Sequence, residues 1–242
     1  MRIGTWNVEY ARGQVRNAQR RARLQQADAD IWILTETHDD LIPGEGWQAV
    51  SSDPRRGADS GGRWVTIWTR LPLIMALDVT DADRTAACLI EAPTGPLIVF
   101  GTVLPWHADR GEIPTTPPPR NWQEQYRVIP NQAADWRSLQ AAFPPAALCV
   151  AGDLNMSLGG PQYYGTATGR TLLADAMAAS GLKAATAFDC VPAGLLQHPM
   201  IDHILLPQAW MAAARVAHAW EGTSPPDGKL SDHSGAVVEV SC

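Results

Sequence analysis

Five short polar clusters stand where apolar segments of the chain begin or end, and their side chains could hydrolyse a phosphate ester. In the clearest cluster, Asp153 and Asn155 follow the apolar run 147–151. Side chains two residues apart in an extended chain point to the same side, so a carboxylate and an amide lie next to each other. The carboxylate can orient or deprotonate a water molecule. The amide can donate to a phosphate oxygen or bind a hard metal ion.

The other four clusters bring further carboxylate, amide and imidazole groups: Asn7 with Glu9, Thr35 with Glu36, Asp202 with His203, and Asp232 with His233. Each cluster alone has a simpler explanation. Asp153 and Asn155 could form only a turn that closes a strand. His203 is better explained as a hydrogen-bonded core histidine, because it and Asp202 point to opposite faces. Five such clusters together favour a site carried on the ends of a rigid scaffold.

The composition sets limits on the class of protein. A chain of 242 residues with 45% hydrophobic residues is expected to form one domain over residues 1–242 with a sizeable core. With a net charge of −6, the chain lacks the excess of basic residues that is typical of proteins that bind nucleic acid tightly. A nuclease is still allowed, because it needs only local positive charge. Four scattered cysteines indicate neither a zinc ribbon nor a disulfide framework. No apolar run is long enough to span a membrane and no signal peptide is visible, so a cytoplasmic protein of open oligomeric state is expected.

Apolar runs predict the elements that position these clusters. Strands are expected at 2–8, 31–35, 47–51, 64–69, 74–79, 86–91, 97–104, 147–151, 182–188, 201–206, 213–220 and 235–240. A turn at 93–96 predicts a hairpin of 86–91 with 97–104. Helices are expected at 14–27, 171–180 and 122–143, the last interrupted near Pro130. Many strands and few helices indicate sheets packed on each other, with helices outside.

Loops are expected at 52–63, 105–120 and 221–229. The Pro-rich loop 105–120 is the longest, and long loops within compact domains are often functional lids. Two other features favour structural explanations. One helical face carries Arg16, Arg20 and Arg23, which we expect to be solvated rather than a phosphate track. Base stacking is conceivable for Trp106, Trp122 and Trp136, but packing in the core or anchoring of loops is the stronger expectation.

From its first cluster to its last, the chain resembles the metal-dependent endonuclease/exonuclease/phosphatase superfamily, which has deoxyribonuclease-I-like and exonuclease III-like members. The resemblance rests on Gly-Asp-Leu-Asn at 152–155 and Ser-Asp-His at 231–233. Thr-Trp-Asn at 5–7, Thr-Glu-Thr at 35–37 and Ile-Asp-His at 201–203 support it. It implies an α/β (α+β) fold, a four-layer αββα sandwich of two mixed β-sheets flanked by helices. The clusters would converge at one edge of the sandwich.

The resemblance also implies roles for single residues. The catalytic set would be Asp153, Asn155, Asp202 and His233, with Asp153 positioning or deprotonating the attacking water and Asp202 orienting His233. The metal ligands, for Mg2+ or alternatively Mn2+, would be Asn7, Glu9, Glu36 and Asp232. The substrate contacts would be Asn155 and His107. Glu36 would be the principal ligand, which suits Mg2+ because this ion keeps several waters and needs few protein carboxylates.

Departures from the family pattern leave the substrate open. Many members carry a histidine in the strand that matches 101–104, whereas here the nearest one, His107, lies in the following loop. Gly-Gly-Arg at 61–63 stands where pancreatic deoxyribonuclease has an acidic partner for that histidine. We expect a Mg2+-dependent phosphodiesterase or nuclease acting on a phosphate ester, with nucleic acid as a candidate. The alternatives are a phosphomonoesterase for a small or lipid phosphate, and a catalytically inactive binding module on the same fold.

Overall fold

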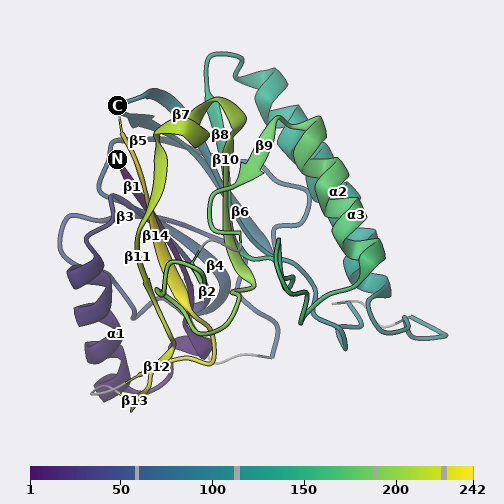
Figure 1. Cartoon of the computed structure of the whole chain (residues 1–242), viewed down its shortest axis with the longest axis horizontal. Helices are drawn as coiled ribbons and strands as arrows, with labels where there is room; N and C mark the ends of the chain where they lie inside the picture. The colour runs from purple at the N-terminus through teal and green to yellow at the C-terminus, as the bar shows by residue number, and fades with distance from the viewer. Residues whose placement is uncertain (58–59, 112–114, 188–189, 225–227, 242) are drawn as a thin grey trace.

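The computed structural model describes residues 1–57, 60–111, 115–187, 190–224 and 228–241 (Figure 1). One six-stranded sheet has the order β11-β14-β1-β2-β4-β3. Its strands are β1 (Arg2–Asn7), β2 (Ile31–His38), β3 (Gln48–Ser51), β4 (Gly62–Thr69), β11 (Ala214–Trp220) and β14 (Gly235–Val240). The neighbours β1 and β2 are parallel, and the other pairs are antiparallel.

The second six-stranded sheet has the order β5-β6-β7-β8-β10-β9. Its strands are β5 (Leu73–Leu77), β6 (Thr85–Ala92), β7 (Gly95–Val103), β8 (Ala147–Asp153), β9 (Leu182–Ala184) and β10 (Asp202–Pro207). Here β7 and β8 are parallel and the remaining pairs are antiparallel. Both sheets are therefore mixed, and the predicted hairpin of β6 with β7 is confirmed.

Helices cover the outer faces of the two sheets. Figure 1 shows α1 (Gln14–Ala27) on one side and α2 (Gln123–Ala142) with α3 (Ala167–Ala179) on the other. Two short 3-10 helices, η1 (Glu9–Ala11) and η2 (Gln208–Ala213), complete the described helices. The layers confirm the predicted αββα sandwich. None of the described helices has the length and apolar character that crossing a membrane requires.

The two-residue period of the strands explains where the polar ends point. In β1, Ile3 faces the core between the sheets, whereas Trp6 packs on the side of α1. In β8, Cys149 faces the same central core and Val150 packs toward α2 and α3. Burying each such large apolar side chain contributes roughly 1.5–3 kcal/mol. Asn7 lies an even number of residues from Ile3, so it ends β1 on the face between the sheets.

Several predicted boundaries were wrong, because pairing stops early in one segment and continues into polar residues in two others. The strand expected at 182–188 ends at Ala184, and Phe188 lies outside the described residues. The strand expected to end at Thr35 continues to His38. The loop expected at 221–229 contains a two-stranded ribbon of β12 (Thr223–Ser224) with β13 (Gly228–Lys229).

The helices differ from the predictions at specific residues. Pro130 lies inside an uninterrupted α2, on its exposed side. A proline inside a helix costs about 3 kcal/mol, and the buried face of this helix, with Trp136 fully in the core, offsets that cost. Helix α3 begins at Ala167 rather than at 171, because the Thr166 hydroxyl accepts a hydrogen bond from the Gly169 amide at 3.0 Å and caps the first turn.

Arg20 contradicts the expectation of a solvated basic face on α1. Its side chain is buried, and its guanidinium donates to the Leu230 carbonyl at 2.9 Å and to the Asn17 side chain at 2.8 Å. A buried guanidinium is retained when its donors are satisfied. Arg20 therefore fastens the segment that leads into the loop of Asp232 and His233 to α1.

Candidate active site

Three strand ends meet between the two sheets and bring Asn7, Asp153 and Glu36 together. The Asn7 amide nitrogen donates to Asp153 Oδ2 at 3.1 Å and to Glu36 Oε1 at 3.1 Å. Asn7 and Asp153 are buried and belong to different sheets. The amide therefore links two carboxylates that would otherwise repel each other, and it fixes the spacing between the sheets at this edge.

Glu36 reaches this cluster through an unusual backbone conformation. Its φ is 46°, in the left-handed region, which is uncommon for residues other than glycine. The pairing of β2 with β4 continues on both sides of it, at Thr35 and Thr37. In a regular strand Glu36 would point to the same face as Leu34, which packs toward α1. The left-handed conformation turns the carboxylate toward Asn7. Burial raises the pKa of Glu36, although the Asn7 amide lowers it.

Asp202 and His233 form a carboxylate–imidazole pair. Asp202 begins β10 opposite Asp153 in β8, and its Oδ2 lies 2.6 Å from His233 Nδ1. The loop that carries His233 is fixed to β1, because the Trp6 indole donates to the His233 carbonyl at 3.1 Å. Burial alone would lower the pKa of His233, but the charges of Asp202 and Asp153 raise it to about 11. The imidazole is therefore held as a cation, with Nδ1 on Asp202.

Asp153 is completely enclosed by this arrangement. Burial, and after it the negative charge of Asp202, raise the pKa of Asp153 to about 8. The backbone amide of Asn155 donates to Asp153 Oδ1 at 2.9 Å, and Asn155 itself has a left-handed φ of 48°. The Asn155 side-chain nitrogen donates to the Leu104 carbonyl at 2.9 Å. The predicted amide thus ties two loops together and keeps its oxygen and one N–H for other contacts.

Gly152 allows Asp153 to sit where it does. It has a φ of +135°, and a Cβ atom there would lie 2.0 Å from the Thr102 carbonyl oxygen. Only glycine adopts that conformation at no steric cost. The close approach of β7 and β8 at this point places Asp153, the last residue of β8, beside the end of β7.

Three predicted site residues lie at the edge of the cluster or away from it. Glu9 forms an ion pair with Lys229 at 2.6 Å. Asp232 has a side chain that is 58% exposed, and its Oδ1 lies 4.0 Å from His233 Nε2. His107 is exposed in the loop after β7, 3.4 Å from the Tyr164 hydroxyl. Their roles in binding metal or substrate stay predictions. His203 is a core histidine as predicted, bonded to the Met156 carbonyl at 2.9 Å.

The sequence reasoning gave no role to two residues that support the cluster. The Ser231 hydroxyl donates to the Asn7 carbonyl at 2.6 Å and accepts from the His233 amide at 3.1 Å, so it connects β1 with the histidine loop. Tyr10, with a left-handed φ of 64°, lies beside Glu36 and lowers the pKa of that carboxyl group. Position 231 adjoins a recognised motif and could have been found, but nothing in the sequence places Tyr10 next to Glu36.

The cluster has the donors and the charge that a divalent cation requires. Carboxylate oxygens of Asp153 and Asp202 lie within 4.8 Å of each other, whereas the His233 imidazolium beside them has no free lone pair for a metal. The buried Asp202 Oδ1 has no hydrogen-bond partner among the described residues. Buried carboxylates that outnumber the nearby cations are unfavourable, and hard oxygen donors suit Mg2+ or Mn2+. Glu36, with the adjoining oxygens of the cluster, fits such an ion.

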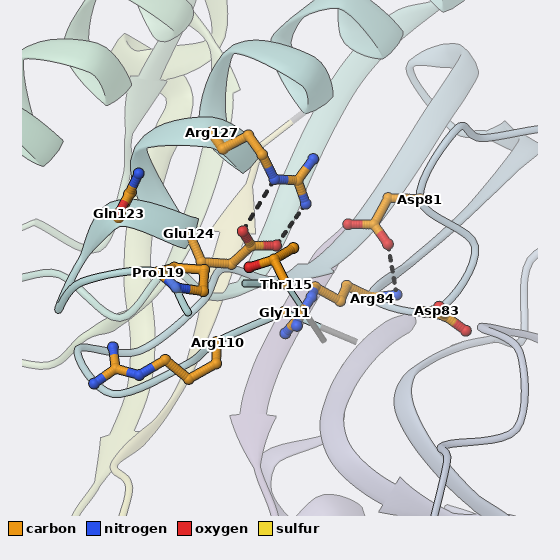
Figure 2. Close-up of a pocket in the computed structure, with 10 residues that line it drawn as sticks. All are labelled: Asp81, Asp83, Arg84, Arg110, Gly111, Thr115, Pro119, Gln123, Glu124 and Arg127. Carbon is orange, nitrogen blue, oxygen red and sulfur yellow. Dashed lines mark hydrogen bonds and ion pairs between the residues drawn. The ribbon is translucent and has the colours of Figure 1, made fainter. Parts of the chain in front are cut away.

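A larger pocket lies beside the long loop 105–120 (Figure 2). Its volume is about 610 Å3, against about 160 Å3 for the cleft at His233. None of the predicted site residues lines it. Figure 2 shows that two of its charged side chains, Glu124 and Arg127, pair at 3.0 Å. Arg84, which also lines the pocket, forms a buried ion pair with Asp109 at 2.7 Å, which anchors the loop. The lid function of this loop stays a prediction, and residues 112–114 lie outside the described part.

Comparison with known proteins gives a family match over most of the chain. Residues 4–233 match the sequence profile of the Endonuclease/Exonuclease/phosphatase family. No curated protein matches the chain.

Several similar solved structures match over the whole chain, among them the following three. A 3'-5' exonuclease (NExo) from Neisseria meningitidis shares 18% identity with a TM-score of 0.69, over 100% of both chains. An AP endonuclease from Archaeoglobus fulgidus shares 16% identity with a TM-score of 0.67, also over 100% of both chains. The human Nocturnin catalytic domain with a bound sulfate anion shares 15% identity with a TM-score of 0.68, over 100% of this chain and 94% of that one. At these identities the likeness shows the fold.

Proposed function

The chain belongs to the Endonuclease/Exonuclease/phosphatase family, and from this premise we propose that it is a Mg2+- or Mn2+-dependent phosphodiesterase. The observation that carries the proposal is the meeting of Asp153 with the Asp202–His233 pair between two sheets. A buried base beside a fixed imidazolium is what a phosphoryl centre needs. Because similar structures include a 3'-5' exonuclease and an AP endonuclease, nucleic acid is the first substrate class to test.

Each residue of the cluster has a distinct task in this proposal. Asp153, when ionised, accepts a hydrogen bond from the attacking water and takes up its proton, as the water oxygen bonds to phosphorus and the bond from phosphorus to the leaving ester oxygen breaks. His233 donates from Nε2 to a phosphoryl oxygen, since its Nδ1 is held by Asp202 at 2.6 Å. Because Asp202 stabilises the imidazolium, the positive charge is in place before negative charge develops on the phosphoryl oxygens. Asn7 holds Asp153 and Glu36 at a fixed separation through two bonds of 3.1 Å.

Glu36, with Asn7 and Asp153 beside it, would hold the divalent cation, which would supply positive charge to the phosphoryl oxygens and favour the ionised form of Asp153. This matters because burial raises the pKa of Asp153 to about 8 in its absence. To bind a cation, Glu36 has to be ionised although it is partly buried, and the hydrogen bond from Asn7 favours the ionised form by lowering its pKa.

The test is hydrolysis of bis-p-nitrophenyl phosphate and p-nitrophenyl phosphate with Mg2+, with Mn2+ and with EDTA. The proposal predicts diester hydrolysis that requires metal and is absent in Glu36→Gln prepared in the same way. Preference for the monoester would make the protein a phosphomonoesterase. No metal-dependent hydrolysis of either ester, of lipid phosphates or of nucleic acids would indicate a binding module and overturn the proposal.

A further inference from the structure

Four aromatic side chains form a continuous row on the surface beside the candidate active site. The aromatic row consists of His107, Trp122, Tyr163 and Tyr164. Ring centroids are 6.5 Å apart for Tyr163 and Tyr164, 5.3 Å for Tyr164 and Trp122, and 6.0 Å for Trp122 and His107. The residues come from the loop after β7, the start of α2 and the loop after β8. The fold therefore gathers them from three distant segments.

The row is open to solvent rather than part of the core. Tyr163 is 61% exposed, His107 is exposed, and Trp122 and Tyr164 are half-buried. In contrast, Trp136 lies in the core, and the ring of Trp106 packs against that of Trp64 with centroids 5.9 Å apart. These two tryptophans therefore have the packing role that was expected of them. Single exposed apolar side chains are ordinary, whereas a contiguous exposed group indicates a binding surface.

Backbone strain at Trp122 supports a functional role for the aromatic row. Trp122 precedes α2 with a left-handed φ of 68°, which is an outlier for a bulky side chain. Such strain is held in place by its surroundings and gathers at functional sites. Here the Trp122 amide donates to the His107 carbonyl at 3.0 Å. That bond keeps the two rings of the row next to each other.

The row leads directly into the catalytic cleft. Tyr163 lines the cleft of about 160 Å3 together with Asp202 and His233. Partial burial of the phenol group, and after it the charges of Asp202, Glu221 and Asp153, raise the pKa of Tyr163, so its hydroxyl lies within electrostatic reach of the cluster although most of the side chain is exposed. A substrate whose phosphate is at His233 would therefore place its neighbouring groups on the row.

The chemistry of the row fits unpaired nucleobases. Aromatic side chains stack on the faces of bases whatever the sequence, whereas a stacked duplex offers only its edges and backbone. The nearby positive charge is local: Arg110 is exposed and donates to Asn121, the residue before Trp122, at 2.8 Å. Such a cation can accompany a backbone phosphate. The net charge of −6 gives no general attraction for duplex backbone.

We propose that the aromatic row binds the unpaired bases of a single-stranded nucleic acid whose scissile phosphate lies at Asp153 and His233. The proposal rests on the proposed phosphodiesterase function, which it narrows to single strands and frayed ends. Stacking on Tyr163 and Trp122 supplies the binding, and the adjoining cleft receives the phosphate.

The experiment measures binding apart from hydrolysis. A fluorescently labelled decathymidylate and a blunt DNA hairpin closed by a non-nucleotide linker, which has no unpaired bases, are titrated with the Asp153→Asn protein in Mg2+, and fluorescence anisotropy gives each Kd. Adding Tyr163→Leu or Trp122→Leu is expected to raise the single-strand Kd about tenfold for each stacked base lost. Tyr163→Phe, which keeps the ring, is expected to bind as the parent does. The hairpin Kd should change much less.

Trp47→Leu is the matched control, because Trp47 is a half-buried tryptophan in the layer of α1 and Trp32. It should leave both Kd values unchanged. An unaltered single-strand Kd in both Tyr163→Leu and Trp122→Leu, or an equal loss for the hairpin, would overturn the proposal. Since Trp122→Leu removes a partly buried ring, circular dichroism checks its fold, and the exposed Tyr163 carries the test alone if that variant unfolds. Diester hydrolysis by a protein that does not bind the single strand would refute only the proposed role of the aromatic row. Single-strand binding by a protein that hydrolyses no diester would refute only the proposed phosphodiesterase function.

Discussion

Replacing Asp202 by asparagine removes one negative charge from the Asp202–His233 pair and keeps its shape. The carboxylate is fully buried and its Oδ2 lies 2.6 Å from Nδ1 of a side chain that is only 16% exposed. At an effective dielectric constant of about 20, charges centred about 4 Å apart attract by about 4 kcal/mol. Losing that attraction lowers the pKa of His233 by about 3. The wild-type value of about 11 would therefore fall to about 8 in Asp202→Asn.

The sign of the effect follows from the proposed role of the imidazolium. Catalysis needs His233 protonated, so activity is lost as pH rises through its pKa. Wild-type kcat/KM for a simple diester should stay level from about pH 8 to about pH 9.5. In Asp202→Asn it should decline over the same interval, with about thirtyfold extra loss at about pH 9.5 because only about 3% of His233 stays protonated.

The assay is a pH–rate profile for bis-p-nitrophenyl phosphate at saturating Mg2+. Glu221→Gln is the matched control, because Glu221 lines the same cleft but its carboxylate bonds to Ser234 at 3.0 Å and to the Gln197 amide at 2.7 Å. Its alkaline limb should stay where the wild type has it. A loss in Asp202→Asn that is the same at every pH would refute the electrostatic reasoning and leave Asp202 only a structural role.

Three further predictions test the metal and the fold. Glu36→Gln should lose the rise in Tm that Mg2+ gives the wild type, measured by thermal unfolding; an equal rise in both proteins would remove Glu36 from the metal site. The acid limb of the activity should move to lower pH as Mg2+ increases, because Asp153 has a raised pKa of about 8 without the cation and the cation favours its charged form; a fixed limb would exclude Asp153 as the group responsible. Gly152→Ala should lower the free energy of unfolding by about 3 kcal/mol and Tm by about 6–12 °C, since its Cβ would meet the Thr102 carbonyl at 2.0 Å. Gly181→Ala, with a φ of +65° and open space, should cost only about 1 kcal/mol, and equal losses in the two variants would contradict the steric argument.

Strand periodicity predicted much of this architecture. Asn7, Asp153 and Asp202 stand at the ends of apolar strands, and their parity alone places them on the face between the sheets. Local patterns were sufficient to place these side chains, because alternate residues of a strand point to opposite faces and the apolar ones mark the buried face. The four-layer sandwich of two mixed sheets came from the family resemblance. Apart from the hairpin of β6 with β7, the order of the strands within each sheet was not predicted, since no local pattern encodes which strands become neighbours.

The remaining features depend on contacts between distant residues. Glu36 points to Asn7 because of one left-handed residue, which a regular strand pattern does not predict. Glu9 pairs with Lys229, 220 residues away, so its carboxylate has a partner that the local sequence gives no hint of. Arg20 can be buried because the carbonyl of Leu230 accepts a hydrogen bond from its guanidinium. In each case a residue distant in the sequence supplies the partner, which the local pattern does not encode.

The central claim is that Asp153 and His233 act on one phosphoryl group. The direct measurement is a double-mutant cycle of Asp153→Asn and His233→Ala, with kcat/KM for bis-p-nitrophenyl phosphate at saturating Mg2+. Groups that act as a unit lose most of their activity with the first substitution. If the two residues act on one phosphoryl group, each single variant should lose several orders of magnitude in kcat/KM, and the double variant should be nearly as active as the weaker single variant. Losses that multiply in the double variant would show instead that the two residues act independently.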